Sequence, residues 1–149
     1  MKRMVSALVF LAFSVSMMAL PRQYSLASPD GKVVVDVNTG GNISYSVSVD
    51  GVPVLSPSAI SVTLNDGTVY GGGARLRKAV RSSVDNVIKA QVYRKAEVSD
   101  KYNQLELRYR GFNVIFRAYD DGVAYRFVSL SETPFEVKAE QAEFSFPAN

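Results

Sequence analysis

The sequence contains no cysteine, no histidine and no tryptophan among its 149 residues. The absence of cysteine excludes a disulfide framework and a cysteine nucleophile, and the absence of histidine excludes a Ser-His-Asp triad. Together these absences exclude zinc sites built from the two residue types and the attachment of a c-type haem. Any hydrolytic chemistry within these residues would therefore depend on carboxylates, tyrosine, lysine or serine.

The remaining composition is that of one ordinary globular domain. Hydrophobic residues make up 47% of the chain and charged residues 21%, which is more apolar than an intrinsically disordered protein. A chain of this length corresponds to one domain and buries roughly two-thirds of the surface of its unfolded form.

The first residues have the three-part pattern of a secretory signal peptide. A positively charged start (MKR) precedes an apolar run over residues 4–15, and small residues then lead to Pro21. Even when it is counted to Leu20, the apolar stretch has 17 residues, fewer than the roughly 20 of a spanning helix. We expect residues 1–20 to be a cleaved signal peptide and residues 21–149 to form the domain. The protein is then periplasmic or secreted, with no membrane span after cleavage.

Charge is distributed unevenly along the mature chain. Without Lys2 and Arg3, 15 basic and 14 acidic residues remain, a net charge of +1. Residues 75–95 carry seven basic residues and one acid, whereas residues 119–143 carry six acids and two basic residues. The basic stretch is either a face for nucleic acid or anionic glycans, or strand surfaces that pair with each other or with a partner domain. Because exported proteins rarely meet nucleic acid, we favour the second interpretation and expect no nucleic-acid partner.

Alternation of apolar and polar side chains predicts β-strands over most of the chain. Side chains in a strand point alternately to two faces, so this pattern buries one face and exposes the other. The pattern occurs in six segments, at residues 33–37, 43–49, 105–109, 112–118, 123–127 and 135–137. Between residues 84 and 96 the apolar spacing is helical, which leaves a short helix there as an alternative.

Asp-Gly pairs separate several of these segments. They occur at residues 30–31, 50–51, 66–67 and 121–122, and they favour hairpin turns because both residue types tolerate positive φ angles. Closely spaced strands joined by hairpins favour antiparallel sheets over parallel βαβ units. The sequence therefore predicts an all-β protein with an antiparallel β-sandwich.

Residue patterns for catalysis or metal binding are missing from the sequence. Glycoside hydrolysis needs two carboxyl groups roughly 5–10 Å apart around one sugar, whereas the adjacent acids Asp120 and Asp121 belong to a predicted turn. We assign no catalytic residue and no metal ligand. Tyr70 and Tyr119 are the candidates for sugar contact, because a tyrosine ring has an apolar face and a polar tip. Such tyrosines also line sheets and domain interfaces.

Several motifs over residues 23–149 resemble the start of glycoside hydrolase family 97, in the same order and at matching spacing. The most specific is the run over residues 116–127 (FRAYDDGVAYRF). The others are residues 28–32 (SPDGK), 45–47 (YSV), 50–55 (DGVPVL), 102–105 (YNQL) and 143–147 (EFSFP).

The resemblance implies an exported α-glucosidase or α-galactosidase with three parts. These are an N-terminal β-sandwich related to galactose-mutarotase-like domains, a (β/α)8 catalytic barrel and a small C-terminal β domain. In this family the catalytic carboxylates, and most ligands of an associated calcium ion, belong to the barrel. The resemblance further implies that a chain ending at Asn149 holds an incomplete, non-catalytic sandwich without a cofactor of its own. Its partners are then the missing barrel and the oligosaccharide substrate of the parent enzyme.

Two alternatives stay open for the function of the domain. One is a stand-alone secreted carbohydrate-binding module in which Tyr70 and Tyr119 form a platform, and the other is an immunoglobulin-like interaction module. In every case we expect Arg117 and Arg126 to pair with Asp120, Glu106 or a neighbouring strand. An incomplete sandwich exposes a strand edge and part of an apolar face, so we expect the isolated segment to be poorly soluble or dimeric.

Overall fold

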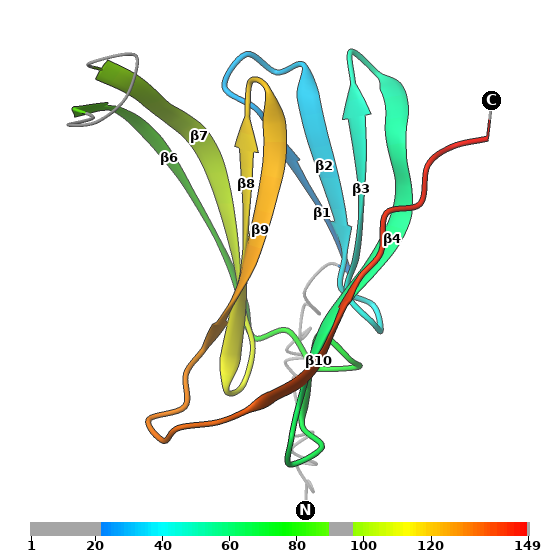
Figure 1. Ribbon diagram of the computed structural model, residues 1–149. Coiled ribbons are helices and arrows are strands. Elements are labelled where there is room, and N and C mark those ends of the chain that lie inside the picture. Colours follow the sequence, from blue (N-terminus) through cyan, green and yellow to red (C-terminus); the bar gives the residue numbers. More distant parts are fainter. Residues whose placement is uncertain (1–21, 90–96, 149) are drawn as a thin grey trace, which may run out of the picture.

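Every regular element in the computed structural model, which describes residues 22–89 and 97–148, is a β-strand. Two antiparallel sheets pack face to face (Figure 1). The first sheet contains β1 (Gln23–Ala27), β2 (Val33–Asn38), β3 (Ser44–Val49), β4 (Val52–Leu64) and β10 (Val137–Ala142) in that order, with β5 (Val69–Tyr70) also paired to β4. The second contains β6 (Lys78–Lys89), β7 (Glu97–Arg108), β8 (Phe112–Tyr119) and β9 (Gly122–Ser129). The predicted all-β antiparallel sandwich is confirmed.

The predicted signal peptide, residues 1–20, lies outside the described residues. Within those residues no helix is long and apolar enough to cross a membrane.

The core lies between the inner faces of the two sheets, where β1 and β2 pack on β7 and β8. Tyr45 of β3 reaches across this core, because its ring centroid lies 5.9 Å from that of Phe116 on β8. Full burial of one large apolar side chain stabilises the fold by about 1.5–3 kcal/mol. The side chains that are almost completely enclosed are Ile43, Ile60, Leu105, Leu107, Val35, Val37, Val114 and Phe116.

Three of the four Asp-Gly pairs, at residues 30–31, 50–51 and 66–67, lie between consecutive strands, as predicted. At residues 50–51, Asp50 (φ 50°) and Gly51 (φ 78°) both have positive φ angles, as in the two-residue turns that match strand twist. The β8–β9 connection differs from the others. Tyr119 pairs with Gly122, so the turn residues there are Asp120 and Asp121.

The alternative of a short helix between residues 84 and 96 is wrong for the part that the structure describes. Residues 84–89 belong to β6, which pairs with β7 from Lys78 opposite Arg108 to Lys89 opposite Glu97. β-branched side chains such as Val84 and Val87 favour extended backbone. The remaining residues of the predicted helix, 90–96, lie outside the described ranges.

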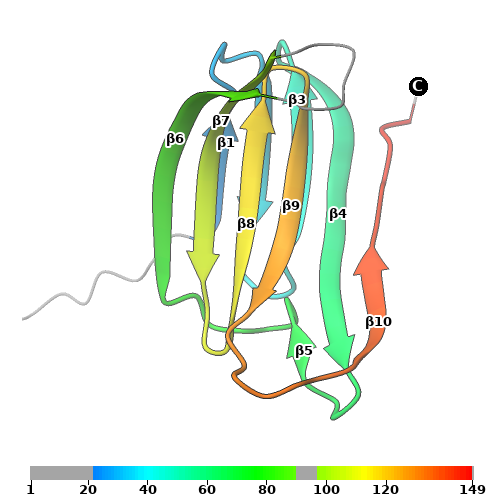
Figure 2. The same ribbon diagram turned by 60° about the vertical axis from the view of Figure 1, so that its left-hand side comes forward.

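β10 lies next to β4 at the edge of the first sheet (Figure 2). Register pairs Ala142 with Ile60 and Glu140 with Val62, so these two β10 residues share the inner face with the fully buried Ile60. All described residues from 130 to 148 are nevertheless exposed. We call the exposed surface formed by β10 and residues 143–148 the open side of the sandwich.

The prediction that residues 135–137 bury one face is wrong, because these residues are exposed. Phe135 precedes β10 and is 46% exposed, and Val137 is 57% exposed. Their alternation with Glu136 and Lys138 is real, but Phe135 and Val137 line an open cavity of about 400 Å³ beside β9 instead of packing in the core.

Candidate functional site

The structure places the two tyrosines selected for sugar contact far apart. Tyr70 ends β5 and stacks on Phe112, the first residue of β8, with ring centroids 4.6 Å apart. Tyr119 ends β8, seven residues further along the strand, which corresponds to about 23 Å of extended chain. The two rings therefore lie near opposite ends of the second sheet, and sugar contact by either one stays a prediction.

The surroundings of the two tyrosines also differ. Tyr70 is 8% exposed, and its hydroxyl lies 3.2 Å from the Ser129 hydroxyl. Tyr119 is half-buried and packs against Tyr102 at a centroid distance of 5.1 Å. Tyr70 thus has the environment of a core residue, whereas Tyr119 keeps part of its ring at the surface.

Tyr70→Ala is expected to lower the free energy of unfolding by about 3–5 kcal/mol, because it leaves a cavity against Phe112. Tyr70→Phe keeps the stacked ring and loses one hydrogen bond, a cost of about 1 kcal/mol. Chemical denaturation followed by circular dichroism measures both values, with Val54→Ala, at a position 41% exposed, as the surface control. Equal stabilities for the two Tyr70 variants would show that the ring does not pack in the core.

Arg117 pairs with a residue of the neighbouring strand, which is one of the three pairings expected from the sequence. Its Nε donates to Oε1 of Gln104 on β7 (3.0 Å), and its guanidinium carbon lies 4.3 Å from the Tyr102 ring centroid. Arg117 forms no ion pair with Asp120 or with Glu106. Glu106 is instead bound to Arg108 at 2.7 Å.

Arg126 forms no ion pair within the described part of the chain. Its expected pairing with a carboxylate is therefore not found there, and its side chain is exposed on β9.

Two of the motifs quoted above meet at one end of the sandwich. The Asp120 carboxylate accepts a hydrogen bond from the backbone N–H of Asp30 (2.9 Å), although the two residues are 90 positions apart. The Asp30 carboxylate accepts hydrogen bonds from the Ser28 hydroxyl (2.6 Å) and from the backbone N–H of Lys32 (3.0 Å). The Ser28 hydroxyl and then the Lys32 N–H hold the pKa of Asp30 below its usual value. These acids therefore connect the β1–β2 turn to the β8–β9 turn.

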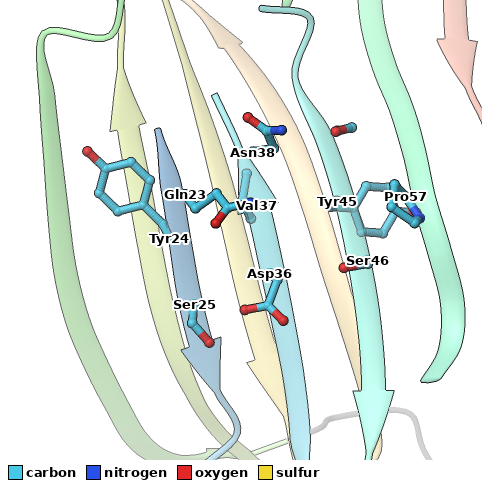
Figure 3. A pocket seen from close by; sticks show the side chains of 10 residues that line it. Gln23, Tyr24, Ser25, Asp36, Val37, Asn38, Tyr45, Ser46 and Pro57 are labelled. Carbon is cyan, nitrogen blue, oxygen red and sulfur yellow. The ribbon is translucent and has the colours of Figure 1, made fainter. Parts of the chain in front are cut away.

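A hollow of about 490 Å³ lies along β1, β2 and β3 of the first sheet, and Figure 3 shows the side chains that line it. Asp36 of β2 lies opposite Ser25 of β1 and Ser46 of β3 in register. Such oxygen atoms bind sugar hydroxyls in many proteins, but sugar sites commonly add an aromatic face. The two tyrosines at the hollow, Tyr24 and Tyr45, are buried, so neither presents an open ring face.

The described residues do not fit the calcium ion that the resemblance implies for a full-length enzyme. In residues 22–89 and 97–148, no three acidic side chains are placed to hold a metal ion together. We therefore assign no calcium ligand here.

The comparison that decides the family covers nearly the whole domain. A family model described as "Glycosyl-hydrolase 97 N-terminal" matches residues 26–149. The chain belongs to glycoside hydrolase family 97.

Two curated relatives carry related names. A "Retaining alpha-galactosidase" of Bacteroides thetaiotaomicron is 40% identical over 150 residues, which cover 100% of this chain and 22% of the relative. A "Probable retaining alpha-galactosidase" of Streptomyces bingchenggensis is 28% identical over 128 residues, covering 83% of this chain and 20% of the relative.

Two solved structures have the same fold in this region. A family 97 enzyme of Pseudoalteromonas sp. strain K8, solved in complex with panose, matches with a TM-score of 0.73 and 21% identity, over 83% of this chain and 20% of that one. A beta-arabinopyranosidase matches with a TM-score of 0.74 and 26% identity, over 83% and 21%. The chain thus spans about a fifth of the length of these relatives, and it corresponds to the N-terminal sandwich of a family 97 glycoside hydrolase.

Proposed function

We propose that this sandwich is a non-catalytic scaffold of an exported glycoside hydrolase, which supports a (β/α)8 catalytic barrel and shapes the rim of its sugar pocket. The observation that carries the proposal is the coverage of the relatives. The match extends over 100% of this chain but over only 22% of the retaining alpha-galactosidase. Bond cleavage is then the task of the remaining four-fifths of such an enzyme, to which no described residue belongs.

The hydrogen bonds and ion pairs formed by Asp30, Asp120 and Glu106 support a structural role for these acids. Retaining hydrolysis needs two carboxyl groups roughly 5 Å apart that both face the substrate. The acids that meet in the sandwich, Asp30 and Asp120, both accept hydrogen bonds from backbone N–H groups of the β1–β2 turn. Glu106 is bound to Arg108 and to the Asn113 amide. Each of these carboxylates fixes local structure.

The names of the curated relatives support a proposal for the substrate class of the complete enzyme. We propose α-linked galactosides as the first candidate, because both curated relatives are called alpha-galactosidases, and α-linked glucosides as the second. We further propose that the protein is exported to the periplasm or beyond, on the basis of the leader-like residues 1–20. A calcium ion, where the enzyme uses one, would be held by the catalytic part.

The complete gene product is expected to hydrolyse p-nitrophenyl α-galactoside, with the α-glucoside as the second substrate. A deletion of residues 22–149 is expected to lose this activity, because the barrel loses its supporting domain. Circular dichroism of the deletion variant shows whether the barrel still folds. Full activity of the deletion variant would contradict the scaffold role, and inactivity of the complete product on both substrates would contradict the substrate class.

A further inference from the structure

A groove of about 570 Å³ lies between β1 and β6. Each is an edge strand, because β1 pairs only with β2 and β6 only with β7 in the described part of the chain. β1 packs against β7 and β8, so β6 extends past the first sheet, as Figure 2 shows. One wall is formed by Arg77, Lys78 and Arg81, and the other by Gln23, Tyr24 and Ser25.

The wall near β6 contains three basic residues, of which Arg81 lies on the inner face of β6 opposite Leu105, whereas Lys78 lies on the other face opposite Arg108. Arg77, Lys78 and Arg81 form no ion pair with any acid of residues 22–89 and 97–148, and no acid lines the groove. Neighbouring charges of the same sign repel each other, and a bound anion would relieve that repulsion. The basic excess of residues 75–95 therefore includes a positive groove.

The hydroxyl of Tyr24 is a second, independent feature of the groove. The residue is 9% exposed, and its buried oxygen has no hydrogen-bond partner among the described residues. Figure 3 shows the ring extending from β1 toward β6. Burial raises the pKa of this hydroxyl, and the charge of Arg81, which lines the same groove, opposes the rise. A carboxylate between them would accept the hydroxyl hydrogen bond and pair with the guanidinium.

The backbone of β1 also faces the groove. Thr39 N–H donates to the carbonyl of Arg22, and Ser28 N–H donates to the carbonyl of Val33, so the even-numbered residues of β1 bond to β2. In an antiparallel pair these groups alternate. Gln23 and Ser25 therefore direct their N–H and C=O groups to the outer edge of β1, which is where an extended peptide adds to a sheet. Further along this edge, the Ala27 carbonyl already accepts a hydrogen bond from the Asn103 amide (2.9 Å).

We propose that this groove binds an extended acidic polypeptide segment, which pairs with β1 as an added strand and places carboxylates against Arg81, Arg77 and the Tyr24 hydroxyl. Side chains of a strand alternate between faces, so the ligand carries Asp or Glu at every second position. The outward backbone groups of Gln23 and Ser25 favour a polypeptide over an anionic glycan, because only a polypeptide continues the ladder of main-chain hydrogen bonds.

Calorimetric titration of the complete gene product tests the proposal. The probe is a blocked octapeptide that alternates threonine and glutamate, and its control replaces every glutamate by glutamine. We expect the glutamate peptide to bind at least tenfold more tightly than the glutamine peptide. The double variant Arg77→Gln/Arg81→Gln is expected to lose at least tenfold in affinity, whereas Arg110→Gln/Arg126→Gln, at two exposed basic positions elsewhere, leaves the affinity unchanged.

The variant Ser25→Pro distinguishes binding of a polypeptide strand from binding of an anionic glycan. Proline is tolerated where the N–H faces a free edge, and the substitution removes that N–H while it keeps every charge. We expect it to weaken the peptide at least fivefold and to leave binding of a sulfated oligosaccharide unchanged, with thermal melts to verify folding. Charged residues also protect strand edges from aggregation. Absence of peptide binding would therefore overturn the proposal in favour of that protective role, and indifference of the peptide to Ser25→Pro would overturn strand addition.

Discussion

Phe116→Ala is expected to lower the free energy of unfolding by about 3–5 kcal/mol, the usual cost of removing a buried phenylalanine ring. Phe116 is 0% exposed at the centre of β8, and its ring contacts Tyr45 of the opposite sheet and Tyr125 of β9. The substitution therefore removes a contact between the sheets as well as one within the second sheet. Because a domain has about 5–15 kcal/mol of stability in total, the variant would be close to unfolding at physiological temperature.

Denaturant titration followed by circular dichroism measures this loss. Val54→Ala is the matched control, since Val54 is also apolar but is 41% exposed, and its expected effect is about 0.5 kcal/mol or less. A loss under about 1 kcal/mol for Phe116→Ala would mean that the two sheets do not pack as the structure shows.

The isolated 149-residue chain is expected to bind a hydrophobic dye and to self-associate, whereas the complete gene product does neither. On the open side, Phe144 is 62% exposed and Phe146 is 75% exposed. Next to it, a cavity of about 400 Å³ reaches the inner face, where Val62, Tyr125 and Phe127 line it. Contiguous apolar surface of this kind promotes association, and so do strand edges without a partner.

Dye fluorescence and sedimentation velocity measure the two properties. The double substitution Phe144→Ser/Phe146→Ser is expected to reduce dye binding and association of the isolated chain. A monodisperse, cooperatively melting monomer that binds no dye would show that the sandwich is complete with the residues described here. It would also remove the main physical reason to expect a covering segment from the rest of the enzyme.

The strands that face both the core and the solvent could be predicted from the sequence, because their two faces differ in polarity. β3 has this regular alternation of apolar and polar residues, and β2 has it except at Val34. β4 lacks it, since Pro53 and Pro57 interrupt the pattern and its pairing with β3 contains register shifts near Val47. β6 lacks it because its residues are mostly exposed on both faces at the edge of the second sheet. Pairing with β7, a non-local contact, decides its structure.

The absence of a catalytic motif and the family resemblance could be inferred from the sequence, but the local arrangement of the acids could not. The contact between Asp30 and Asp120 depends on bringing two turns together over 90 positions, which no local pattern encodes. The burial of Tyr70 likewise depends on Phe112 of the other sheet. The basic stretch was visible in the composition, whereas the groove that contains part of it required the offset of β6 from β1.

The rate at which the purified 149-residue chain hydrolyses p-nitrophenyl α-galactoside tests the scaffold role most directly. Because Asp30, Asp120 and Glu106 are bound within turns and strand pairs, and because the proposal assigns bond cleavage to another part of the enzyme, we expect a rate that equals the uncatalysed background at every enzyme concentration. The complete gene product, assayed in parallel, is expected to turn over many times per minute. Enzyme-like turnover by the short chain alone would contradict the account, since it would place the catalytic groups within the sandwich.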